Sequence, residues 1–252
     1  MKYMGSKSKI VDEIAPIIQH RIDQFGAEIY IEPFCGGCNV IDKIKAPKKW
    51  GGDNNPYLIA LWEHLQETST LPDKITKEEY VEARLSYRSK DGKCEPWFIG
   101  AAGLLASYNG KFFGGYAGIG YEGKRVRDYY RESRDNVLNQ INSSDFLTNT
   151  TFAYSDYASL IPTVEEKEKT NKIVIYCDPP YRNTTKYGHI TKFDYDLFWD
   201  KVREWSQKYP VLVSEMDAPD DFEVVWERDV IRSLNAKKRT KSNERLCQWK
   251  KM

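Results

Sequence analysis

The feature that most constrains this chain is a buried strand that ends in a carboxylate, two prolines and an aromatic ring. Residues 173–176 are a continuous apolar run, typical of a parallel strand covered on both faces. Asp178-Pro179-Pro180-Tyr181 follows at its carboxyl end, where ligands bind in open α/β sheets. Two prolines fix two φ angles and remove two amide donors, so neighbouring carbonyls can accept hydrogen bonds from a bound molecule. An ordinary strand-to-loop exit is the alternative for the tetrapeptide taken alone.

Length and composition predict a cytoplasmic α/β protein. A chain of 252 residues fits one large domain or one domain carrying an insertion. Charged residues make up 30%, and neither a membrane-spanning apolar run nor a signal peptide is present in the sequence. The five cysteines do not suggest a disulfide framework. Cys35 and Cys38 form a single C-x-x-C without a second pair, so no zinc site is expected.

The order of predicted elements indicates an α/β fold with an insert. Helical periodicity follows Ser6 or Ser8 up to Gly26, and Pro56 opens a second helix. Between residues 67 and 148 the alternation of strands and helices breaks down. This part predicts helices after Thr76, over 97–108 and over 126–141, with a glycine-rich and aromatic loop at 109–123. Strands are predicted at 28–32, 50–52, 151–154, 173–177, 211–214, 223–226 and 245–249, and another helix at 194–209.

The local distribution of charge indicates a polyanionic partner, although the net charge of the chain is only +1. Six basic residues between positions 109 and 134 alternate with aromatic residues, and a second basic stretch covers positions 237–241. Such mixtures suit phosphate contacts and base stacking. A solvated charged face explains either stretch equally well when it is considered alone.

Two further features indicate a nucleoside-containing ligand. Gly36-Gly37 follows the first strand, where glycines allow a backbone to approach a ligand closely. Asp53 ends the second strand, where an acidic side chain accepts hydrogen bonds from ribose hydroxyls. No Walker lysine follows the glycines, and the three histidines show neither triad nor metal-ligand spacing, so no metal is expected.

Five motifs, in chain order, resemble those of one enzyme family. They are Lys2-Tyr3-Met4-Gly5-Ser6-Lys7, Glu32-Pro33-Phe34-Cys35-Gly36-Gly37-Cys38, Gly52-Asp53-Asn54-Asn55-Pro56, Ser155-Asp156-Tyr157 and Asp178-Pro179-Pro180-Tyr181. Tyr108-Asn109-Gly110 falls where that family begins a DNA-contacting loop. The chain therefore resembles the Dam-type DNA adenine N6-methyltransferases that use S-adenosylmethionine.

The resemblance implies a fold, a cofactor and a partner. The fold is a Rossmann-like methyltransferase sheet with an inserted, mostly helical target-recognition subdomain. Residues 1–66 and 149–252 would form the catalytic, S-adenosylmethionine-binding domain, and residues 67–148 the DNA-binding insert. Double-stranded DNA is the expected partner, without a membrane or a metal, and a monomer is compatible with the sequence.

The resemblance also assigns roles to residues. The expected catalytic residues are Asp178, Pro179, Pro180 and Tyr181. The expected cofactor-binding residues are Tyr3, Lys7, Phe34, Gly36, Asp53, Asn54, Asp156 and Asp178. The expected DNA-binding residues are Lys2, Asn109, Lys111, Arg125 and Arg127. A surface position for Lys7, a helix N-cap for Asp53 and a simple turn for Asp156 are the structural alternatives.

In the implied mechanism, two acceptors activate a poor nucleophile. The Asp178 carboxylate and the Pro179 carbonyl accept the two N–H groups of the adenine exocyclic amine, and Tyr181 stacks on the base. The adenine must be flipped out of the duplex to reach them. Preorganised acceptors then favour attack on the sulfonium methyl group.

Two departures from the family pattern and three rival functions remain. Cys38 replaces the third glycine of the cofactor loop, and Ser6 replaces a glycine of the N-terminal motif. Cytosine N4-methylation is disfavoured because those enzymes usually carry Ser-Pro-Pro-Tyr at this motif. An RNA substrate would require no change of chemistry. A non-catalytic DNA-binding relative of the fold is supported only by Cys38.

Overall fold

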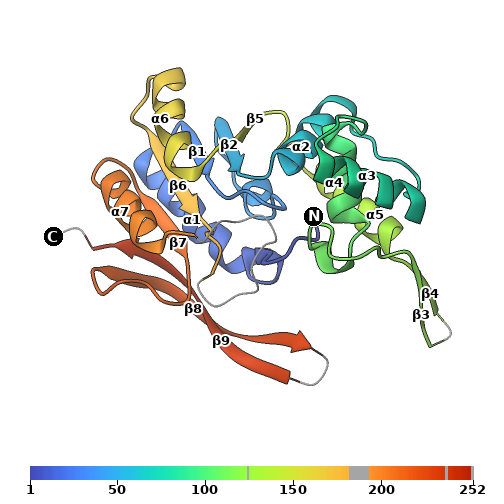
Figure 1. Ribbon diagram of the computed structural model, residues 1–252. Coiled ribbons are helices and arrows are strands. Elements are labelled where there is room, and N and C mark those ends of the chain that lie inside the picture. The colour runs from blue at the N-terminus through green and yellow to red at the C-terminus, as the bar shows by residue number, and fades with distance from the viewer. Residues whose placement is uncertain (124, 182–192, 236–237, 251–252) are drawn as a thin grey trace.

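Figure 1 shows the computed structural model of the chain, which describes residues 1–123, 125–181, 193–235 and 238–250. Its α-helices are α1 (Val11–Phe25), α2 (Pro56–Thr68), α3 (Lys77–Ser89), α4 (Pro96–Leu105), α5 (Tyr129–Ser143), α6 (Tyr157–Glu168) and α7 (Tyr195–Ser206). Its strands are β1 (Ile29–Glu32), β2 (Lys48–Asp53), β3 (Ile119–Glu122), β4 (Arg125–Asp128), β5 (Thr150–Tyr154), β6 (Ile173–Cys177), β7 (Val211–Ser214), β8 (Phe222–Asn235) and β9 (Lys238–Trp249). Short 3-10 turns cover Lys7–Lys9, Ile41–Lys43 and Tyr108–Gly110.

The central sheet is a doubly wound sheet with one antiparallel hairpin at its edge. Its strand order is β5-β2-β1-β6-β7-β9-β8. The first five strands are parallel, and β9 pairs antiparallel with both β7 and β8. The chain order reverses between β1 and β6, which is the point where such sheets bind ligands. The predicted Rossmann-like methyltransferase fold is confirmed.

Each face of the sheet packs against its own set of helices. Tyr30, Val174 and Leu212 belong to the core that includes buried residues of α1, α2 and α4. Ile31, Ile175 and their neighbours belong to the core on the other face, which includes buried residues of α6 and α7. Continuous burial along β1 and β6 explains why their sequences show no polar alternation.

Local residues end α1 and begin α2 and α3 as the sequence predicts, but neither Ser6 nor Ser8 caps α1. Its N-cap residue is Ile10, and Ser6 instead caps the 3-10 turn Lys7–Lys9 by accepting from the Ser8 amide. Gly26 ends α1 in the left-handed conformation at φ 62°. The Asn55 side chain accepts from the amides of Tyr57 and Leu58, so α2 begins directly after the predicted ribose turn. Thr76 and Glu79 form the expected capping box of α3.

The structure corrects the prediction for residues 109–141. The predicted loop contains β3, which pairs with β4 to form an antiparallel hairpin. The last helix of this part begins at Tyr129, capped by Asp128, and not at Val126. Glycines at 120 and 123 weakened the strand pattern in the sequence.

Three other elements differ from the prediction. The α6 helix was not predicted, because Pro162 and several polar residues interrupt its apolar pattern. β8 and β9 are much longer than the segments predicted at 223–226 and 245–249, and Figure 1 shows them extending beyond the other strands.

Within the described residues, no helix is both long and apolar enough to cross a membrane.

Candidate active site

The carboxyl ends of three adjacent strands carry predicted motifs, and a fourth is followed by an acid that was not predicted. β1 leads into the glycine turn, β2 ends at Asp53, β6 is followed by Asp178, and β7 is followed by Glu215. These strands are neighbours in the order β2-β1-β6-β7, so the four segments meet at one edge of the sheet. This edge contains the switch point expected to bind ligands.

Lys7 lies against the tetrapeptide after β6. Its Nζ is 2.5 Å from Asp178 Oδ1 and 4.5 Å from the centre of the Tyr181 ring. Lys7 is 5% exposed and Asp178 is 21% exposed, so this ion pair is shielded from solvent. Burial in an ion pair excludes the alternative that Lys7 is a solvated surface lysine.

Hydrogen bonds fix the rest of the tetrapeptide. The Tyr181 hydroxyl donates to Glu244 Oε2 at 2.6 Å, which joins the tetrapeptide to β9. The Tyr195 hydroxyl donates to the Pro180 carbonyl at 2.8 Å. The hydroxyl end of the Tyr181 ring is therefore held by a strand 63 residues further along the chain.

The glycine turn after β1 encloses the side chain of Tyr3. A Cβ atom at Gly36 would lie 2.9 Å from the Tyr3 ring, and one at Gly37 would lie 2.9 Å from the Tyr3 Cβ. Gly36 also has a φ of +44°, which L side chains rarely adopt. A hydrogen bond also fixes the turn, because Trp62 Nε1 donates to the Gly36 carbonyl at 3.0 Å.

Asp53 is buried at the end of β2 and is hydrogen-bonded to the glycine turn. Its carboxylate accepts from the amides of Gly36 at 3.2 Å and Asn55 at 2.9 Å. Burial raises the pKa of Asp53 to about 6, against the lowering effect of these bonds. The Asp53 side chain is not the N-cap of α2, because the Asn55 side chain has that role.

The remaining predicted cofactor residues lie around this edge. Phe34 stacks on Tyr157 with ring centres 5.3 Å apart. Asp156 is exposed and caps α6 through the amide of Ala158 at 2.9 Å, so its predicted structural role is present. Asn54 is exposed directly after Asp53.

The unusual Cys38 keeps the backbone shape that a glycine would favour. Its φ is 54°, in the left-handed region, and its side chain is fully buried in the core that contains α1 and α2. Gln140 Nε2 donates to its carbonyl at 2.9 Å. The burial of Cys38 accounts for tolerance of a side chain at a position where the family has glycine.

Two buried carboxyl groups near Asp178 were not predicted from the sequence. Glu32 accepts from the Tyr30 hydroxyl at 2.7 Å, and burial is the main cause that raises its pKa to about 8. Burial also raises the pKa of Glu215 to about 7, and the nearby Asp178 charge adds to the increase. Among the residues that the structure describes, Glu215 Oε2 has no hydrogen-bond partner. The position of Glu215 directly after β7, the strand next to β6, is the sequence feature that could have indicated its place in the site.

Stability should therefore fall with rising pH. Glu32 keeps its proton in the folded chain up to about pH 8 but loses it near 4.5 when unfolded. Between these values the folded state binds the extra proton, so the free energy of unfolding decreases by up to about 1.4 kcal/mol per pH unit. Urea unfolding at pH 5 to 8 should show a shallower decrease for Glu32→Gln than for wild type. Exposed Glu166→Gln is the control, and an identical slope in Glu32→Gln would contradict the prediction.

The predicted DNA-binding residues fall into two groups. Lys2 and Asn109 are exposed neighbours, because a Cβ at Gly110 would lie 2.5 Å from the Lys2 carbonyl oxygen. Lys111 is exposed beside them. Arg127 instead binds Glu132 through two nitrogens, at 3.0 and 2.6 Å, and lies over the Tyr129 ring. Arg125 lies on β4 opposite Glu122.

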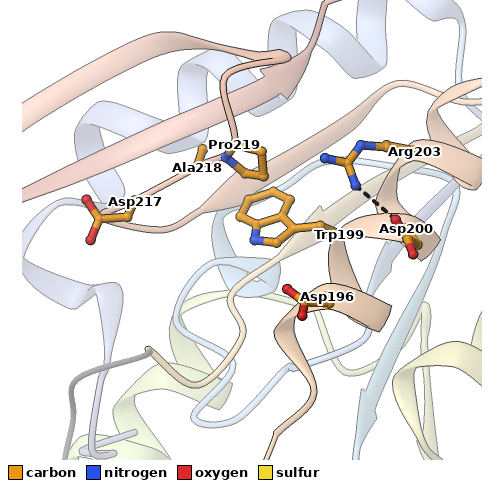
Figure 2. A pocket seen from close by; sticks show the side chains of 7 residues that line it. All are labelled: Asp196, Trp199, Asp200, Arg203, Asp217, Ala218 and Pro219. Atoms are coloured by element: carbon orange, nitrogen blue, oxygen red, sulfur yellow. Dashed lines mark hydrogen bonds and ion pairs between the residues drawn. The ribbon is translucent and has the colours of Figure 1, made fainter.

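A surface pocket is lined by residues outside the predicted cofactor set. Figure 2 shows this pocket of about 310 Å³, formed by the start of α7 and the loop after β7. Its lining residues are Asp196, Trp199, Asp200, Arg203, Asp217, Ala218 and Pro219. None of them is a predicted cofactor residue.

In the described ranges, no group of three or more histidine, cysteine or acidic side chains could hold a metal ion.

Comparison with known families identifies the type of enzyme. Residues 3–218 match the family model described as D12 class N6 adenine-specific DNA methyltransferase. The chain belongs to this family. The suspected resemblance is therefore confirmed, and the chain is an adenine-specific DNA methyltransferase. The matched residues include positions 67–148 and the tetrapeptide but end before β8.

Comparison with individual proteins gives distant similarities. A search of curated proteins found no match to this methyltransferase. Two solved structures of the rRNA methyltransferase AviRa from Streptomyces viridochromogenes are similar to it. They are 9% and 11% identical, have TM-scores of 0.45 and 0.43, and are aligned over 97% and 96% of this chain and 85% of theirs.

Proposed function

We propose that this methyltransferase transfers a methyl group from S-adenosylmethionine to the exocyclic amine of an adenine flipped out of duplex DNA. The observation that carries the proposal is the position of Asp178. Its carboxylate lies at the switch-point edge of the sheet, between the glycine turn and β7. The same edge carries the residues proposed to bind cofactor.

The residues of this edge fit the cofactor. Tyr3 packs closely against Gly36 and Gly37, which are buried, and only residues without a side chain leave room for it at this turn. Each Asp53 oxygen accepts one amide, which leaves lone pairs for two ribose hydroxyls. The Asp178 carboxylate favours a cation over a neutral molecule, and a bound cation would also favour ionisation of Glu215, whose pKa is raised to about 7. When bound, S-adenosylmethionine supplies an electrophilic methyl group on a positively charged sulfur.

Asp178 and Pro179 have the chemistry that an amine acceptor pair requires. The amine lone pair of adenine is delocalised into the ring, and acceptance of both N–H groups favours a tetrahedral nitrogen with a localised lone pair. Lys7 occupies Asp178 Oδ1 in this structure, so an arriving amine shares or replaces that contact. Lys7 thus holds the carboxylate in place before the base arrives.

The flipped base is proposed because the acceptors are recessed. Pro179 and Tyr181 are buried, and Asp178 is only 21% exposed. An adenine paired inside a helix cannot bring its amine to such groups. Residues 67–148 are proposed as the target-recognition insert, since the exposed Lys2, Asn109 and Lys111 lie where it meets the N-terminal motif.

A substrate comparison tests this proposal. The protein would be incubated with radiolabelled S-adenosylmethionine and long duplex DNA, the separated single strands, or RNA of the same sequence. The proposal predicts transfer to duplex DNA at least about 10-fold faster than to the other two, as expected for recognition through grooves and phosphates. Faster transfer to RNA would contradict it.

Cofactor affinity should depend on the charge of Asp53. Ribose hydroxyls bind an ionised carboxylate more strongly than a neutral one, so wild-type affinity should rise as pH increases through about 6. Asp53→Asn should weaken binding about 10-fold to 100-fold and remove this pH dependence. Isothermal titration with S-adenosylmethionine measures both effects, and exposed Asp12→Asn on α1 is the control. Unchanged binding by Asp53→Asn would disprove the assigned role.

A further inference from the structure

The β8–β9 hairpin continues well past the sheet to which it belongs. β7 pairs only with Leu246 and Cys247 of β9. Residues 229–235 and 238–243, which we name the distal ribbon, pair with each other beyond this point. Six residues of β9 at about 3.4 Å each give a projection of roughly 20 Å. Figure 1 shows the ribbon running out from the sheet.

The distal ribbon leaves the sheet on the side of the active site. The carboxyl-terminal residue of β7, Ser214, pairs with Leu246, and the ribbon residues of β9 precede Leu246. Because β9 is antiparallel, the ribbon extends from the carboxyl edge of the parallel strands. Its base is tied to the catalytic tetrapeptide, since Glu244 accepts from the Tyr181 hydroxyl at 2.6 Å.

The base of the ribbon is also fixed to the catalytic domain. Arg228 forms an ion pair with Glu13 of α1. The Glu215 amide donates to the Arg245 carbonyl at 3.2 Å, and Arg245 Nη1 donates to the Met216 carbonyl at 3.2 Å. These contacts set the direction of the ribbon relative to the active-site edge.

The distal ribbon has an excess of positive charge. It contains four basic residues, Arg232, Lys238, Arg239 and Lys241, and one acid, Asp229. All four basic residues belong to the paired strands of the ribbon. The chain as a whole has a net charge of only +1, so the ribbon concentrates positive charge at one end of the molecule.

We infer that the distal ribbon is a second DNA contact, which binds phosphates of the duplex on one side of the target adenine. This inference rests on the proposed function, because it takes duplex DNA as the substrate. A two-stranded ribbon fits the major groove, and a ribbon with an excess of basic residues suits a surface lined by phosphates. A reach of roughly 20 Å corresponds to about six base pairs beyond the target, at about 3.4 Å per step.

The main alternative is protection of an edge. Lysine and arginine on exposed strands prevent strands of other molecules from pairing with them. That role would also explain the charge, but it gives no reason for a ribbon fixed to the catalytic tetrapeptide. It predicts no effect of the basic residues on DNA binding.

The test compares matched double variants of the full chain. Arg239→Gln with Lys241→Gln and Arg232→Gln with Lys238→Gln each remove two charges from the ribbon. Lys169→Gln with Lys172→Gln removes two exposed charges just before the amino end of β6, at the opposite edge of the sheet. Binding to a long duplex is measured by fluorescence anisotropy over a range of KCl concentrations. Thermal unfolding confirms that each variant is folded.

If the ribbon contacts phosphates, the ribbon variants bind more weakly by about 10-fold at moderate salt. The slope of log affinity against log salt falls by roughly 0.9 for each lost phosphate contact, while the control matches wild type. The difference disappears on a duplex cut about three base pairs from the target on the ribbon side. Ribbon variants that match the control on the long duplex would overturn the inference.

The same experiment separates this inference from the proposed function. Transfer to duplex DNA by the wild type, together with ribbon variants that behave like the control, refutes only the ribbon contact. DNA binding that depends on the ribbon, without methyl transfer by the wild type, refutes only the proposed catalysis.

Discussion

Replacement of Asp178 by alanine should lower the rate of methyl transfer to DNA by about 100-fold to 1,000-fold. The substitution removes a carboxylate acceptor that the proposed mechanism aims at the adenine amine, and loss of one preorganised group of this kind has an effect of that size. The rate of transfer from radiolabelled S-adenosylmethionine, measured at saturating DNA, tests this expectation.

Asp178→Ala also leaves Lys7 buried without its ion-pair partner, so lower stability is expected as well. Asp178→Asn separates the two effects. Its side-chain oxygen can still accept from Lys7, but it lacks the negative charge and offers an amide NH2 donor to the adenine in place of one acceptor. It should bind DNA and cofactor yet transfer slowly. Exposed Asp217→Asn is the control, and wild-type turnover by Asp178→Asn would rule out the acceptor role.

Trp62→Ala should reduce the free energy of unfolding by about 3–5 kcal/mol, the usual cost of truncating a fully buried aromatic side chain. The indole is stacked on Phe152 and donates to the Gly36 carbonyl, so its loss should also loosen the glycine turn and weaken cofactor binding. Urea unfolding and cofactor titration measure the two effects.

Two further variants make the Trp62 result specific. Trp62→Phe keeps most of the packing but leaves the Gly36 carbonyl without its donor, at a cost of about 1–3 kcal/mol. Trp97→Ala removes a half-buried indole that stacks on His64, and it should cost less than Trp62→Ala. Equal losses in Trp62→Ala and Trp97→Ala would show that the indole under the glycine turn has no special role.

The sheet could be predicted from the sequence because its signals are local. β6 is a continuous apolar run, α2 starts at an Asn-Pro cap, and α1 ends at Gly26. The β3–β4 hairpin was missed because it is exposed: Ile119, Tyr121 and Val126 are all more than half exposed. Such a strand pair buries little, so its sequence has no core-facing pattern.

The site could be predicted only in part. Sheet topology brings the ends of β1, β2 and β6 together, so the motifs on them were expected to meet. The contacts of Tyr181 with Glu244 and of Lys7 with Asp178 join residues 63 and 171 positions apart. Such contacts depend on tertiary structure and leave no local signal. The long ribbon was missed for a similar reason, since its charged strands resemble a solvated loop.

The burial of the acids explains why Asp178 has a cationic partner. Glu32 and Glu215 both have raised pKa values, and the charge of Asp178 contributes to both increases. A lysine ammonium at 2.5 Å offsets part of that repulsion while leaving the carboxylate beside the proposed substrate site. A cationic cofactor would offset the same repulsion further.

The most direct test of the central claim is to identify the product base. Purified wild-type protein is incubated with unmethylated duplex DNA and S-adenosylmethionine, and the DNA is digested to nucleosides and analysed by mass spectrometry. We predict N6-methyladenine, in amounts that depend on added cofactor and protein, and none with Asp178→Ala. A methylated cytosine instead of adenine, or DNA that stays unmodified although the protein binds both DNA and cofactor, would contradict the account.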